Sequence, residues 1–153
     1  MGNRSAGRRF RGLSVSGDLA ASSGPSTDAV HTLLGRYFDG LFRSDAELLA
    51  TVFHPSAIYA TASEGSLTHL TMDHYLPLVA ARESPASRGE TRTDAVESIQ
   101  FAGTDTALAR VRCSIGPRRF IDLLSLLSVD GRWQIIAKVF HVDLAEPASC
   151  GGE

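Results

Sequence analysis

Asp122 and His141 are the polar residues best suited to chemistry in a stretch that otherwise alternates like apolar strands. If the turns at Gly116-Pro117 and Asp130-Gly131 each contain two residues, Asp122 lies opposite Val139 and shares a sheet face with His141. A carboxylate on an apolar face has a raised pKa unless it is paired. That setting suits proton transfer, with Asp122 as the transferring group and His141 as its partner. The alternative is that Asp122 only fixes the sheet, through a hydrogen bond to His141 or to an arginine.

Two tyrosines and three histidines are weaker candidates for the same pocket. Tyr37 lies on the apolar side of a predicted helix and Tyr59 on a predicted strand. Either hydroxyl could be a donor, although core packing is the more common role for such rings. His54, His69 and His74 lie near the ends of predicted elements and are candidates for the pocket mouth. A helix cap is the alternative for His54, and a surface position is the alternative for the other two.

The sequence shows no pattern for a metal ion or an organic cofactor. Its five histidines are scattered, and Cys113 and Cys150 do not form a Cys-x-x-Cys pair. Glycine-rich phosphate loops and a nucleophile elbow are also absent. We therefore expect no cofactor. Two cysteines cannot make a disulfide scaffold, which favours a reducing, cytoplasmic setting, and Cys113 should be a buried, inert thiol.

Three helices are predicted in the first half of the chain. Apolar residues recur at helical spacing from Val30 to Phe42, behind capping residues at 26 and 27. Ser44 and Glu47 resemble a capping box and start a second, short helix that ends at 54–55. Strands are expected at 57–61 and 67–70. A third helix is expected at 71–82, where Pro77 should kink it or delay its start.

The second half of the chain reads as four long strands, at 91–101, 106–115, 119–129 and 132–144. The order of elements predicts an α+β fold in which three N-terminal helices pack on one face of a curved antiparallel sheet. The register of the last three strands predicts two faces. The inner face contains Ala107, Ala109, Val111, Cys113, Phe120, Asp122, Leu124, Leu126, Trp133, Ile135, Ala137, Val139 and His141. The outer face contains Arg110, Arg112, Arg119, Leu123, Ser125, Gln134, Ile136, Lys138 and Phe140.

Composition fits one small globular domain. The chain has 153 residues, 43% of them hydrophobic, and a net charge of −2. Residues 1–25 are rich in arginine, serine and glycine and are expected to be a disordered tail, residues 26–144 the domain, and residues 145–153 a flexible end. From residue 27 onward, 11 basic and 16 acidic groups give an acidic body, which argues against nucleic acid as a partner. No apolar run approaches the ~20 residues of a membrane-spanning helix.

Several strings resemble those of the nuclear transport factor 2-like (NTF2-like) superfamily, and in particular its SnoaL-like and "putative lumazine-binding" groups. They are YFDGLFRSD at 37–45, VFHPSA at 52–57, VAARESPASRGE at 79–90 and DLLSLLSVDGRWQIIAKVFH at 122–141. The resemblance covers roughly residues 28–143. It implies a cone-shaped, cystatin-like fold that encloses a small-molecule pocket, and a dimer.

The resemblance does not fix one reaction, because the superfamily includes isomerases, cyclases, dehydratases and proteins that are not enzymes. We consider three functions. The first is a cofactor-free acid–base enzyme, an isomerase, cyclase or dehydratase acting on a small apolar metabolite such as a polyketide. The second is a protein that binds a small ligand without catalysis. The third is a dimeric assembly module whose cone is filled by side chains.

The predicted outer face suggests a homodimer. Arg110, Arg112 and Lys138 alternate there with Leu123, Ile136 and Phe140. Such a face is too apolar to be left in water. A second copy of the chain is the simplest way to cover it, and the resemblance implies the same.

Overall fold

The computed structural model describes residues 25–144 and contains three helices and six strands in that range. The elements are α1 (Pro25–Arg43), α2 (Ala46–Val52), β1 (Phe53–Thr61), β2 (Thr68–Thr71), α3 (Met72–Ala81), β3 (Ala95–Ala102), β4 (Thr106–Ile115), β5 (Arg118–Val129) and β6 (Arg132–Leu144). The tail predicted for residues 1–25 lies outside the described residues except at Pro25. The end predicted for residues 145–153 lies wholly outside them.

The helices were predicted closely, with differences at their ends. Helix α1 begins at Pro25, so residues 26 and 27, which were expected to cap it, lie inside it. The cap of α2 is Asp45, whose side chain accepts a hydrogen bond from the Leu48 backbone N–H, and not Ser44, which has a positive φ of 50°. Ser44 therefore belongs to the turn between α1 and α2, and the predicted capping box is wrong by one residue. Helix α3 begins at Met72 and continues through Pro77, so the proline does not delay its start.

The strands also follow the predictions, most closely in the second half of the chain. The bounds of β4 and β6 agree with those predicted, and β5 begins one residue early at Arg118. Strand β3 begins at Ala95, later than predicted, because residues 91–94 form part of the loop. Strand β1 begins at Phe53 and includes His54 and Pro55, which we had placed at the end of the second helix.

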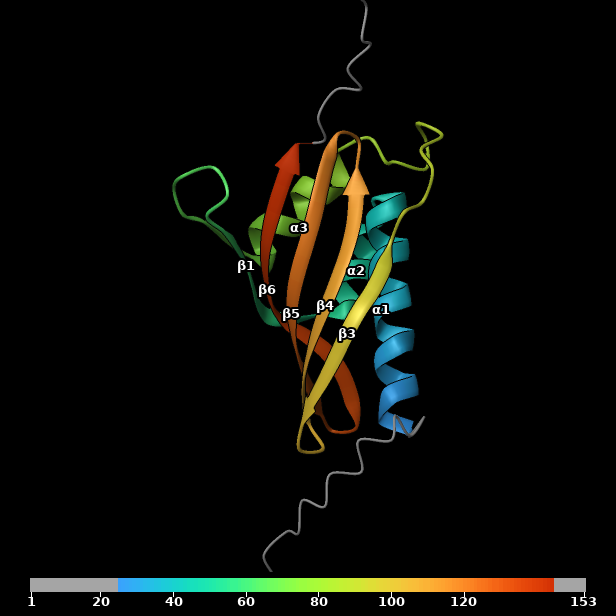
Figure 1. Ribbon diagram of the computed structural model, residues 1–153, viewed down its shortest axis with the longest axis vertical. Helices are drawn as coiled ribbons and strands as arrows, with labels where there is room; N and C mark the ends of the chain where they lie inside the picture. The colour runs from blue at the N-terminus through green and yellow to red at the C-terminus, as the bar shows by residue number, and fades with distance from the viewer. Residues whose placement is uncertain (1–24, 145–153) are drawn as a thin grey trace, which may run out of the picture.

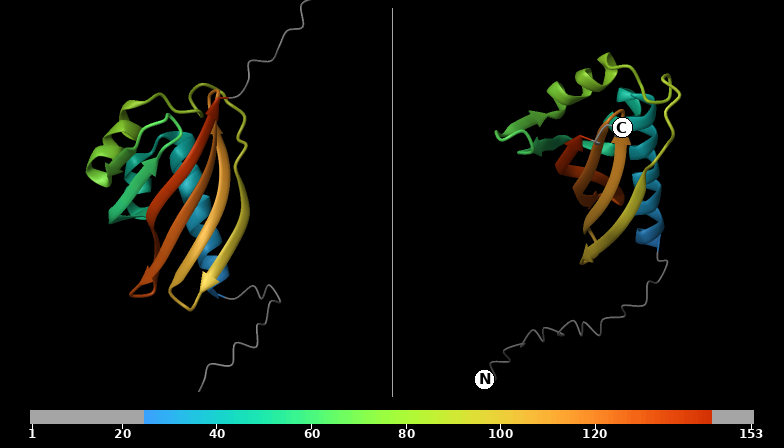
Figure 2. Two further views of the ribbon diagram at one scale, coloured as in Figure 1. Left: turned by 60° about the vertical axis from the view of Figure 1, so that its left-hand side comes forward. Right: turned by 45° about the horizontal axis from the view of Figure 1, so that its top comes forward.

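The six strands form one sheet in the order β2-β1-β6-β5-β4-β3. All neighbours are antiparallel except β1 and β6, which run parallel. The sheet curves around the helices: α1 runs along its inner face, and α3 lies beside β1 and β2 at one end (Figure 1). Figure 2 shows that the sheet does not close, which leaves a cone with the helices on one side. The predicted α+β architecture is confirmed, with one parallel pair added.

The predicted register is correct for β4 and β5 and wrong for the end of β6. Val111 pairs with Asp122 and Cys113 with Phe120, as expected. On β6, however, Leu126 pairs with Ile135 and Ser125 with Ala137, so Ile136 is an extra residue in a bulge. Because side chains alternate along a strand, one extra residue exchanges the faces of all residues that follow it.

The bulge reverses the predicted faces of the β6 residues that follow it, beginning with Ala137, which pairs with Ser125 of the outer face. Asp122 pairs with Phe140 and not with Val139. Lys138 and Phe140 face inward, with exposed fractions of 3% and 7%, although both were predicted on the outer face. Val139 is 46% exposed and His141 is exposed, although both were predicted to face inward.

The core lies between α1 and the inner face of the sheet. The helix buries Val30, Leu34 and Tyr37 completely, against Leu124 and Leu126 on β5 and others on the sheet. No helix within residues 25–144 is long and apolar enough to cross a membrane.

Candidate functional site

A buried cluster of three polar side chains lies at the centre of the cone. The Tyr37 hydroxyl on α1 donates a hydrogen bond of 2.5 Å to Oδ2 of Asp122 on β5. Nζ of Lys138 on β6 lies 3.8 Å from the same oxygen. Asp122 is fully buried and its Oδ1 has no hydrogen-bond partner within the described part of the chain. The Asp122 carboxylate and the Lys138 ammonium group are thus both removed from water, and their opposite charges compensate each other.

Five aromatic rings surround the Lys138 ammonium group. Its nitrogen lies 5.1–5.8 Å from the ring centroids, within the range of cation–π attraction. These rings belong to Tyr37, Tyr59, Tyr75, Phe120 and Phe140. They also contact one another, with Tyr59 and Tyr75 stacked at 4.6 Å. The rings and Asp122 together make a site in which a lysine stays charged although it is buried.

The environment of the cluster shifts the pKa of three groups upward. Burial lowers the pKa of Lys138, but attraction to the Asp122 carboxylate and to neighbouring groups outweighs burial, so the net direction is upward. Burial, reinforced by Asp122, raises the pKa of Tyr37 well above 10.0. Burial also raises the pKa of Cys113 from 9.0 to about 12. At neutral pH we therefore assign an ammonium to Lys138, a phenol to Tyr37 and a thiol to Cys113.

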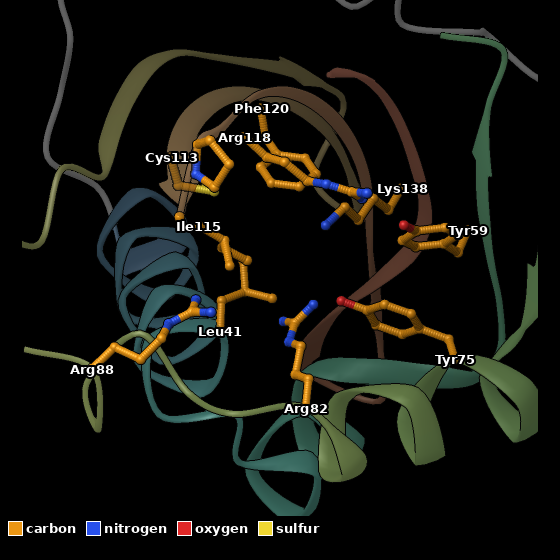
Figure 3. A pocket seen from close by; sticks show the side chains of 12 residues that line it. Leu41, Tyr59, Tyr75, Arg82, Arg88, Cys113, Ile115, Arg118, Phe120 and Lys138 are labelled. Atoms are coloured by element: carbon orange, nitrogen blue, oxygen red, sulfur yellow. The ribbon is translucent and has the colours of Figure 1, made fainter. Parts of the chain in front are cut away.

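A cavity of about 260 Å³ opens beside this cluster. Lys138, Tyr59 and Tyr75 point into it from one side, and Arg82, which follows α3, points into it from below (Figure 3). The apolar part of the cavity wall is formed by Leu41, Cys113, Ile115 and Phe120. Asp122 does not line the cavity, so Lys138 is the member of the buried pair that a ligand would meet.

The loop after α3 closes one side of the cavity. Arg88 forms a salt bridge of 2.7 Å with Glu90. Glu90 in turn accepts a hydrogen bond of 2.5 Å from the Gly116 backbone N–H, in the β4–β5 turn. Arg92 pairs with Asp39 on α1 at 2.6 Å. These contacts fix the loop between the helix and the sheet, so the cavity has a defined wall.

Two of the predicted site residues meet, and a third lines the cavity. Asp122 and Tyr37 form the hydrogen bond described above. Tyr59 lies in the cavity wall and on Lys138. The burial of Asp122 among apolar residues is as predicted, although its charged partner is Lys138 and not His141.

The four predicted histidines lie elsewhere. His141 is exposed, pairs with Asp143 at 2.8 Å and contacts the Ser63 hydroxyl at 3.2 Å, because the β6 bulge turns it outward. His54, His69 and His74 do not line the cavity. His54 Nδ1 accepts a hydrogen bond from the Ser56 backbone N–H in β1, and His74 contacts the Thr71 hydroxyl. The expected positions at the pocket mouth are therefore wrong.

Sequence reasoning missed Lys138, Tyr75 and Arg82. Lys138 is the only lysine among the 15 basic residues of the chain, a signal that could have directed attention to it. Tyr75 lies within the predicted third helix, and its position toward the cavity depends on how α3 packs on β1. Arg82 was predicted as the last residue of the third helix, and it instead follows α3, which ends at Ala81. Within residues 25–144 no group of three potential ligands could hold a metal ion.

Comparison with known proteins places this chain in a family. Residues 25–141 match the family described as "Putative lumazine-binding". An NTF2-like protein of unknown function from Silicibacter pomeroyi is 24% identical, with a TM-score of 0.65 over 76% of this chain and 95% of the other. One from Methylobacillus flagellatus is 22% identical, with a TM-score of 0.70 over 80% and 96%.

A third structure, a domain of unknown function with a cystatin-like fold from Nostoc punctiforme, is 21% identical with a TM-score of 0.62, and 78% of each chain is covered. A search of curated proteins found no match. The family match covers most of the chain, and the structural matches agree with it in fold. The chain belongs to the family described as "Putative lumazine-binding" and has the NTF2-like fold.

Proposed function

We propose that the protein binds a small molecule with a flat, unsaturated ring system in the cavity beside Lys138, without transforming it. The observation that carries this proposal is a cavity of about 260 Å³ with aromatic walls and a buried ammonium group. Ligand pockets usually have volumes of about 300–1,000 Å³. This cavity lies just below the small end of that range, so its ligand should have only one or two rings. The Asp122 carboxylate, which we had expected to transfer a proton, is held behind Lys138 and does not reach the cavity.

The cavity walls explain the preference for a flat ring. Tyr59, Tyr75 and Phe120 present ring faces or edges, and aromatic pairs are favourable beyond the area that they bury. The Tyr59 and Tyr75 hydroxyls point toward the centre of the cavity and can orient a polar substituent (Figure 3). The family's description is consistent with a small ligand of this kind.

Titration with 2-naphthamide, a neutral two-ring compound, tests this proposal. We expect saturable binding, and loss of binding in Cys113→Phe, which fills the cavity from the inner face of β4. The matched control is Leu108→Phe on the outer face of the same strand, where the side chain is 38% exposed. Binding that survives in Cys113→Phe would overturn the proposal, as would a native chain that binds neither 2-naphthamide nor a charged compound with the same two rings.

Acid–base catalysis is the second candidate, because of the chain of contacts from Tyr37 through Asp122 to Lys138. An ammonium group at the cavity can stabilise the enolate that forms when a ketone loses an α-proton to water. This step is common to the isomerase, cyclase and dehydratase reactions considered above. Deuterium exchange at the α-carbon of 2-tetralone, followed by NMR, tests it: acceleration by the native chain and not by Lys138→Met supports catalysis, and equal rates exclude it for this ketone.

We also propose a homodimer formed through the outer face of the sheet. Leu123 and Val139 form a cross-strand pair on this face and are 40% and 46% exposed, and Leu108 is 38% exposed nearby. Arg110 and Arg112 beside them pair with Glu97 on β3. A second copy would cover the apolar strip and place charges of both signs at its rim.

A further inference from the structure

The charges around the cavity are unbalanced. Its lining contains the basic residues Arg82, Arg88, Arg118 and Lys138, and no acidic residue. Asp122 compensates Lys138 from behind, and Glu90 compensates Arg88. No ion pair is formed by Arg82 or Arg118 within the described part of the chain. The cavity therefore has an excess of positive charge.

Arg82 is the basic residue at which this excess positive charge is most enclosed by the protein. Its Nε and Nη2 atoms are buried and have no hydrogen-bond partner within residues 25–144. A guanidinium group in a protein carries a permanent positive charge and only donates hydrogen bonds, so a negatively charged acceptor is the partner that suits it. Buried donors without partners are rare in folded proteins. The group points into the cavity across from Lys138 and next to the Tyr75 hydroxyl (Figure 3).

The two unpaired nitrogens also have a specific geometry. Nε and Nη2 lie on one edge of the guanidinium plane, so their N–H bonds are parallel. This is the donor pair that a carboxylate accepts through both oxygens. Lys138 provides a second cation on the opposite side of the cavity. The aromatic rings between Arg82 and Lys138 suit a flat ligand that carries a negative charge.

We propose that the ligand is a small aromatic or conjugated carboxylic acid, bound as its anion, with the carboxylate on Nε and Nη2 of Arg82 and within the field of Lys138. This inference rests on the proposed function and names the ligand's chemical class. It assigns Arg82 as the residue that selects a charged ligand, where the sequence had suggested a small apolar metabolite.

The test compares 2-naphthoate with 2-naphthamide, which have the same rings and differ in charge. Calorimetric titration of the native chain should give a dissociation constant for 2-naphthoate lower by about tenfold or more, since hydrogen bonds to a charged partner are the strong ones. Arg82→Gln should bind the two probes equally, and Arg82→Lys should retain part of the difference. Arg43→Gln, an exposed arginine outside the cavity, is the matched control and should behave like the native chain.

Stability gives a second readout. Because Nε and Nη2 have no partner in the described structure, Arg82→Gln should not lower the melting temperature. Equal binding of the two probes by the native chain would overturn this inference while leaving the proposed function intact, as would a charge preference that persists in Arg82→Gln. If neither probe binds the native chain, or if binding survives in Cys113→Phe, both the inference and the proposed function fail.

Discussion

At the scale of single residues, Asp122 has different partners from the one that its sequence position suggested. It lies in the apolar lining as predicted, yet its partners are the Lys138 ammonium group and the Tyr37 hydroxyl. A carboxylate in that position stabilises a buried cation, and removal of one member of such a pair leaves the other uncompensated. The pair is thus a structural support for Lys138, which is the group at the cavity.

Replacement of Asp122 tests this role. Asp122→Asn keeps the shape and should lower the free energy of unfolding by about 3–5 kcal/mol, because Lys138 becomes an unpaired buried charge. Asp143→Asn, which breaks an exposed pair with His141, should cost less than ~1 kcal/mol. Urea denaturation measures both. An Asp122→Asn variant that is as stable as the native chain would contradict the structural role.

Cys113 should make the protein sensitive to alkali. Its pKa is raised from 9.0 to about 12 in the folded chain by burial first and by Asp122 second. The unfolded chain therefore loses the thiol proton first as pH rises above 9.0, and the folded chain retains it, so rising pH favours unfolding. We expect Cys113→Ala to reduce the fall in unfolding free energy between about pH 8 and about pH 10.5. An identical fall in both proteins, measured by denaturant titration, would show that this thiol is not involved.

At the scale of elements, the sequence predicts what depends on local chemistry. The turn at Asp130-Gly131 has positive φ at both residues, 53° and 77°, as a two-residue hairpin of this composition requires. The pairing of β4 with β5 follows from a second two-residue turn, in which Gly116 alone has a positive φ, of 57°.

The bulge at Ile136 could not be predicted, because nothing in the local sequence marks it. Ile135, Ile136 and Ala137 are three consecutive apolar residues, so the pattern at this point assigns none of them to one face and does not reveal an extra residue. One extra residue moved Lys138 into the site and His141 out of it. Arg82 was missed for a related reason. Its place at the cavity depends on how α3 packs, and the sequence does not show this packing.

Two glycines in α1 provide a test of how this element packs. A Cβ at Gly40 would lie 2.5 Å from Leu49 Cδ2 on α2, whereas a Cβ at Gly35 would meet nothing within 4 Å. Gly40→Ala should therefore cost about 1–3 kcal/mol through overpacking. Gly35→Ala should add about 0.5–1 kcal/mol, because alanine favours the helix. Thermal unfolding of the two variants measures the difference, and equal effects would mean that α1 and α2 pack less closely than described.

At the scale of the whole molecule, the curved sheet has two apolar faces with different roles. The inner face holds the core and the cavity, and the outer face carries the strip of Leu108, Leu123 and Val139. The sequence predicted a dimer through this outer face but named Phe140 as a key contact, whereas Phe140 is buried in the ring cluster around Lys138.

The dimer is therefore tested at Leu123. Leu123→Glu should produce monomers in sedimentation at micromolar concentration, since it places a charge in an apolar interface. Leu67→Glu, an equally drastic change at a 74% exposed leucine before β2, should leave the dimer intact. A native chain that sediments only as a monomer would refute the proposed dimer.

Binding of a small molecule against Lys138 can be measured directly on this chain. Lys138 is the only lysine, so a protein labelled with ¹³C,¹⁵N-lysine gives a single set of lysine side-chain NMR signals. We predict that the Cε signal of Lys138 shifts saturably on titration with 2-naphthoate, and that the shift is lost in Cys113→Phe. A Lys138 signal that stays unchanged while 2-naphthoate binds the protein would contradict the claim, because the binding site would then lie elsewhere.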